Sequence, residues 1–145
     1  MQISKISFKG YTEIKKLPKN PDKTVVRAFK NARPFLRQIG YSMPDHRDLV
    51  INLTTKKGSF NSNYTIMNAY DYNKETGITN LLAQADEHNI TEYGLDFVRD
   101  VFLGLRKHNE QEFKNIAADF VTKLDFAMWE QHPSPPSPPS AWIDN

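Results

Sequence analysis

The sequence predicts an α+β fold in which a small antiparallel sheet is covered by helices. Apolar and polar residues alternate near the start of the chain, and a β-branched stretch follows at residues 49–55. Several longer stretches place apolar residues every three or four positions, which is typical of helices packed on a core. With 39% hydrophobic residues in 145, the chain is large enough for one domain with a substantial core. We expect a hairpin plus an N-terminal strand, covered by an N-terminal basic helix and two or three C-terminal helices.

The first segment is expected to be extended over residues 3–14, as one strand or two short pieces. Ile6 and Phe8 alternate there with polar neighbours. Residues 15–21 are expected to form a basic loop, because they contain two prolines.

A helix is expected to follow, with Asp22 as its N-cap and Gly40 at its end. Its apolar side is formed by Val25, Phe29, Ala32, Phe35, Leu36 and Ile39. Because Pro34 lies inside this pattern, we expect a kink or a break near residues 32–33.

The middle of the chain predicts a β-hairpin. Its strands are expected at residues 49–55 and 64–72, joined by a loop over residues 56–63. After a turn at residues 73–77, the spacing of Leu81, Leu82 and Ala85 predicts a short helix over residues 79–88.

The last third predicts two more helices and a tail. The first begins near Thr91, and the second is introduced by a capping box of Asn109 and Glu112 and ends near His132. The proline-rich residues 133–145 then favour polyproline II. We therefore divide the chain into a single α+β domain over residues 1–132 and a proline-rich C-terminal tail over residues 133–145.

Charge is segregated along the chain. Residues 1–40 hold ten Lys and Arg against two acidic residues, whereas the remainder holds nine basic and fifteen acidic residues. Five of the early cations recur at helical spacing and fall within an arc of about 120°. These are Lys23, Arg27, Lys30, Arg33 and Arg37. We call them the basic stripe.

The basic stripe predicts a surface that attracts an anionic partner. We favour a non-enzymatic protein-binding module, of the adaptor, effector or inhibitor type, whose basic helix face engages an acidic or phosphate-bearing partner. An acidic protein surface is the expected partner. The first alternative is a nucleic-acid-binding protein. An ordinary solvated helix face would show the same pattern.

The loop of the predicted hairpin is a second candidate binding element. Lys56 and Lys57 stand near Phe60 there, and an aromatic ring beside cations can stack on single-stranded bases. The routine alternative is a short surface turn.

Enzymatic chemistry finds little support in the sequence. There is no cysteine, and no nucleophile-elbow or phosphate-loop motif. His46, between Asp45 and Asp48, supports a further alternative, a small hydrolase with His46 as general base. The four histidines are too far apart in sequence for a local metal site, so we expect no cofactor and no metal.

The tail suggests possible binding roles, and the distribution of apolar residues bears on localisation. PxxP spacings in the tail could serve as a ligand motif or a spacer, or the tail could dock on its own domain or on a second copy in a homo-oligomer. No apolar stretch is long enough for a transmembrane segment, and no signal peptide is recognisable. We therefore expect a cytoplasmic protein.

Overall fold

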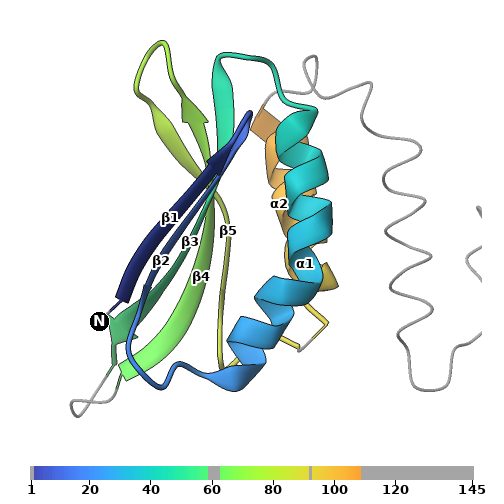
Figure 1. The fold of residues 1–145 in the computed structure, drawn as a ribbon. Helices are drawn as coiled ribbons and strands as arrows, with labels where there is room; N and C mark the ends of the chain where they lie inside the picture. The colour runs from blue at the N-terminus through green and yellow to red at the C-terminus, as the bar shows by residue number, and fades with distance from the viewer. Residues whose placement is uncertain (1, 59–62, 92, 109–145) are drawn as a thin grey trace, which may run out of the picture.

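The computed structural model describes residues 2–58, 63–91 and 93–108. The elements in chain order are β1 (Gln2–Phe8), β2 (Tyr11–Leu17), α1 (Lys23–Tyr41), β3 (Arg47–Lys57), β4 (Asn63–Asn73), β5 (Thr79–Asp86) and α2 (Leu95–His108). Both helices cover the same face of a single sheet (Figure 1).

The sheet has five strands in the order β1-β2-β3-β4-β5. β2 and β3 are parallel, and every other neighbouring pair is antiparallel. The parallel pair arises because α1 lies between β2 and β3 in the chain and returns it to the starting end of the sheet. β1 and β5 are therefore the two edge strands.

The core lies between the sheet and the two helices. Alternate residues of β3 supply its floor, and one side of each helix closes it. Its largest fully buried side chains are Tyr11, Phe29, Leu36, Ile39, Leu49, Ile51, Leu53, Met67, Leu95 and Leu105. The 3.6-residue period of α1 thus buries its apolar side and leaves a polar side outward.

The end of α1 packs against the β1–β2 hairpin through two glycines. A Cβ atom on Gly40 would lie only 2.6 Å from the carbonyl oxygen of Gly10 and 2.9 Å from the Cβ of Tyr11. Gly10 itself has a φ of 76°, which favours glycine in the hairpin turn. Gly40 therefore lies inside the last turn, where it permits close approach, and does not end the helix as we expected.

The predicted fold class is wrong in three respects. The sheet is mixed and has five strands, and only two helices are present in the described part of the chain. Residues 79–86 form β5 where the sequence predicted a helix. The N-terminal segment forms two paired strands where the predicted sheet has a single N-terminal strand, and β2 extends into the predicted basic loop as far as Leu17.

The reason for the error at β5 is a register shift in its pairing with β4 between Ala69 and Tyr70. Such an irregularity places an extra residue in one strand and interrupts strict alternation. In the sequence, Leu81, Leu82 and Ala83 are consecutive apolar residues that do not alternate with polar ones. This pattern also fits the spacing of a helix. The second C-terminal helix and the tail that we predicted lie outside the described residues.

α1 agrees better with its prediction. Asp22 is its N-cap, as expected. Pro34 does not break it, and the helix runs through this position over 19 residues. The proline lies on the exposed side of the helix, so its ring does not disturb the core.

Candidate anion-binding face

The start of α1 is fixed to the sheet by Asp22. The side-chain Oδ1 of Asp22 accepts a hydrogen bond from the backbone N–H of Val25 at 2.9 Å, which caps the first turn. The backbone N–H of Asp22 donates to Thr65 Oγ1 on β4 at 3.0 Å. These bonds set the position of the cations that follow in the first half of the helix.

The first three cations of the basic stripe, Lys23, Arg27 and Lys30, are exposed. They border a shallow groove of about 440 Å³ between α1 and the loop that precedes it. The groove is lined by Lys19, Asn20, Pro21, Lys23, Val26, Arg27 and Lys30. We call it the cation groove. Its lining, as far as the structure describes it, carries four cations and no carboxylate.

The last two cations of the basic stripe turn toward the sheet. Arg33 Nε donates to Glu13 Oε2 at 2.6 Å, and a second bond joins Arg33 Nη2 to Glu13 Oε1. The hydroxyl of Tyr11 also donates to Glu13 Oε2, at 2.6 Å. The Glu13 side chain is 1% exposed and that of Arg33 is 26% exposed. Arg33 is thus part of the helix–sheet interface.

This network fixes the ionisation of its members. Burial alone would raise the pKa of Glu13, but the hydrogen bonds from Arg33 and Tyr11 outweigh it and hold that pKa below its ordinary value. Burial, reinforced by the adjacent Glu13, raises the pKa of Tyr11 far above its ordinary range. At neutral pH Glu13 is therefore a carboxylate, and it neutralises the charge of Arg33.

A second group of cations lies over aromatic rings beside this pair. Lys15 Nζ is 5.0 Å and the Arg33 guanidinium carbon 5.4 Å from the ring centroid of Phe29, and the Arg37 guanidinium carbon is 4.8 Å from that of Phe8. Burial, and next the charge of Arg33, lower the pKa of Lys15. We call Lys15, Arg33 and Arg37 the inner cation cluster.

One polar atom of the inner cation cluster lacks a partner. Arg37 Nε is buried, and no acceptor within the described residues takes its hydrogen. A buried donor without an acceptor is unfavourable by about 1–3 kcal/mol. Among the described residues, the inner cation cluster holds three cations against the carboxylate of Glu13, which is already engaged by Arg33 and Tyr11.

The basic stripe is therefore divided by the structure. Its first three members face the cation groove, while Arg33 and Arg37 belong to the inner cation cluster. The carboxylate that neutralises Arg33 is that of Glu13. It comes from the basic N-terminal region and not from the acidic remainder of the chain.

The end of β3, where the predicted hairpin loop begins, lies at the same end of the sheet as the start of α1 (Figure 1). Lys56 and Lys57 form the exposed end of β3. In the register of β3, Lys57 shares the helix-covered face with Leu53 and Thr55, whereas Lys56 points to the opposite face. Phe60 lies outside the described residues.

The surroundings of His46 lie at the other end of the sheet. Asp45 forms an exposed ion pair with Lys9 at 3.2 Å, and Asp48 pairs with Lys74 at 3.4 Å. The two carboxylates that flank His46 in the sequence thus each pair with a lysine.

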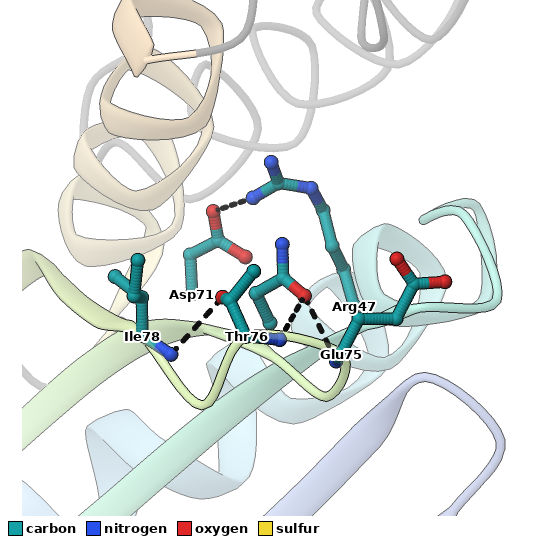
Figure 2. A network of polar contacts seen from close by, with 6 residues as sticks. Arg47, Asp71, Glu75, Thr76 and Ile78 are labelled. Carbon is teal, nitrogen blue, oxygen red and sulfur yellow. Dashed lines mark hydrogen bonds and ion pairs between the residues drawn. The ribbon is translucent and has the colours of Figure 1, made fainter.

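A buried ion pair stands near this end of the sheet. Arg47 at the start of β3 reaches across to Asp71 on β4, whose side chain is fully buried (Figure 2). The adjoining turn is closed by Asn73 Oδ1, which accepts from the backbone N–H groups of Glu75 and Thr76 at 3.0 and 3.2 Å. Arg47 and Asp71 sit among strand residues of the core, so we assign this pair to stability.

The sequence reasoning missed Phe8, Tyr11, Glu13 and Lys15 as parts of the site. A signal was present, because Tyr11, Glu13 and Lys15 alternate and must share one face of a strand. Assigning Lys15 to a loop removed it from that face. The pairing of Glu13 with Arg33, 20 residues away, has no local signal.

No protein family, curated protein or solved structure matches this chain. Neither helix of the described part is long and apolar enough to span a membrane. Within the same residues, no three His, Cys, Asp or Glu side chains gather in a way that could hold a metal ion.

Proposed function

We propose that this chain is a binding module that engages an acidic segment of a protein partner through the cation groove. The observation that supports this proposal most directly is the lining of that groove. It is a concave surface whose described lining contains four cations and no acidic residue, the cations being Lys19, Lys23, Arg27 and Lys30. A concave cationic surface concentrates field lines and attracts anions more strongly than a convex one.

The apolar part of the lining favours a polypeptide over a small ion. Pro21 and Val26 lie among the four cations, so the groove offers both charge and a small apolar contact. Lys57, the exposed last residue of β3, adds a further cation to the described surface. An acidic segment with interspersed apolar residues complements this combination.

The test is fluorescence anisotropy with a labelled decaglutamate peptide at low salt. Lys23→Glu combined with Lys30→Glu is expected to weaken binding about tenfold or more, since it places two carboxylates in the groove. The matched control is Arg106→Glu with Lys107→Glu, an identical change of charge at exposed positions on α2. Equal loss in both variants would show a response to net charge alone and would contradict the proposal.

A decathymidine oligonucleotide, measured in parallel, tests the nucleic-acid alternative. The proposed function predicts that the oligonucleotide binds more weakly than the peptide at physiological salt. Tighter binding of the oligonucleotide, with affinity falling steeply as salt rises, would favour the alternative instead.

A further inference from the structure

β1 is an edge strand of the sheet that the structure describes. β1 pairs with β2 along Gln2–Phe8, and it is the terminal strand of the sheet, so no described strand pairs with its other side. In antiparallel pairing, residues alternate between those that bond to the neighbour and those whose N–H and C=O point away. Half of the residues of β1 therefore present backbone donors and acceptors outward, as a template for another strand.

The helix side of this edge is bordered by the inner cation cluster. The register with β2 and β3 places Ser4, Ile6 and Phe8 on the same face as the core residues Tyr11 and Leu49. Phe8 is 43% exposed although it lies on that face. The guanidinium group of Arg37 lies over the ring of Phe8. We call the helix-covered side of β1, which Arg37 of α1 overlies at Phe8, the ledge.

The charges on this ledge are not balanced. Glu13 is engaged by Arg33 and Tyr11, and Arg37 Nε is buried with no acceptor from the described chain. Lys15 is partly buried beside Arg33 and forms no ion pair within the described residues. Two partly buried cations thus have no carboxylate partner among the described residues, next to an edge that no described strand covers.

Distances along the sheet allow an added strand to meet both cations. Neighbouring strands lie about 4.8 Å apart, so an added strand would run about that far beyond β1 and about twice that far from β2. Arg37 already lies above β1, at Phe8. Lys15 is opposite Ser4 in the register, and its Nζ, which lies 5.0 Å from the ring centroid of Phe29, would turn toward the edge to meet a carboxylate there.

We propose that β1 accepts an extended acidic peptide segment as a sixth strand, whose alternate carboxylates face Arg37 and Lys15. Main-chain hydrogen bonds to β1 would supply affinity, and the alternation of acidic residues on one face would supply selectivity. This site uses other residues than the cation groove and does not rest on the proposed function.

The experiment uses two synthetic octapeptides of equal charge, one alternating Glu and Val and one alternating Glu and Pro. Only the first can form a continuous ladder, because proline lacks the N–H and is excluded from strand pairing. The Glu–Val peptide is expected to bind at least tenfold more tightly. It should also slow hydrogen exchange of the outward-pointing amides of β1, measured by NMR on the full chain.

Two variants examine the cations. Arg37→Gln and Lys15→Gln are each expected to weaken the Glu–Val peptide about fivefold, whereas Lys23→Glu with Lys30→Glu in the cation groove changes its affinity less than twofold. Equal binding of the two peptides, or unchanged exchange of the β1 amides in the complex, would overturn the proposal. So would a concentration-dependent dimer that protects the same amides, because a second copy would then be the occupant of the edge.

Discussion

Arg33 on α1 and Glu13 on β2 face each other across the helix–sheet interface and share two hydrogen bonds. The carboxylate is buried, and Tyr11 supplies a third bond to it. A buried charge is tolerated only when it is paired and hydrogen-bonded. The pair therefore helps to fix the position of α1 on the N-terminal hairpin. Its removal should lower the free energy of unfolding of the whole domain.

Removing one partner of this pair is expected to be more harmful than removing both. Glu13→Leu leaves the Arg33 guanidinium without its carboxylate and should lower the free energy of unfolding by about 3 kcal/mol. Adding Arg33→Met is expected to restore part of this loss, because no uncompensated charge then remains. Urea denaturation of the two single variants and the double variant measures the coupling. Strictly additive losses would contradict a direct interaction.

Stability is expected to depend on pH through Glu13. Its pKa in the folded protein lies below the ordinary value of 4.5, so the folded state binds fewer protons there than the unfolded state. The resulting stabilisation is fully present above that ordinary value and is lost as the pH falls through the lowered pKa. Between about pH 5 and pH 3, wild-type stability should therefore fall more steeply than that of Glu13→Gln, which cannot titrate. Parallel slopes in chemical denaturation would contradict this origin.

The two ion pairs that connect β3 with β4 and its following turn should differ strongly in their contribution. Asp71→Ala removes the fully buried partner of Arg47 and is expected to lower the free energy of unfolding by about 3–5 kcal/mol. Lys74→Ala breaks the more exposed pair with Asp48, and a loss below about 1 kcal/mol is expected. Thermal and urea unfolding of both variants provide the comparison, and similar losses would mean that burial does not govern these pairs.

Close packing at Gly40 should outweigh its poor helix propensity. Alanine is the better helix former by about 1 kcal/mol, yet its Cβ would meet the Gly10 carbonyl and Tyr11. Gly40→Ala is therefore expected to destabilise the protein by about 1–3 kcal/mol. Thr24→Ala, at an exposed position of the same helix, is the control and should be neutral or slightly stabilising. A more stable Gly40→Ala variant would show that the hairpin moves aside.

Local patterns predicted the elements in which periodicity is uninterrupted. α1 was predicted together with its Asp22 cap, because its apolar side repeats regularly over 19 residues. β3 and β4 were also predicted, as a hairpin with nearly the observed limits. β5 was missed because the register shift beside Tyr70 spoils its alternation, and the remaining apolar spacing resembles that of a helix.

The candidate site was predictable only in its outer half. Lys23, Arg27 and Lys30 are exposed as the helical wheel indicates. The same helical wheel assigns Arg33 and Arg37 to this exposed side as well. It describes the helix alone and contains no information about the neighbouring strands β1 and β2. Their partners Glu13 and Phe8 come from a hairpin that precedes α1, and such contacts follow from the arrangement of helix and sheet, not from local spacing.

The contact between Gly10 and Gly40 holds the last turn of α1 directly against the hairpin that carries β1. This backbone contact consequently links Arg37 to the edge strand, so the proposed strand site would be arranged before a ligand arrives. In such a preorganised recess, the loss of conformational entropy on association falls on the incoming peptide. Stiffening that peptide in an extended form, for example by cyclising it into a hairpin, should therefore tighten its binding without any new contact.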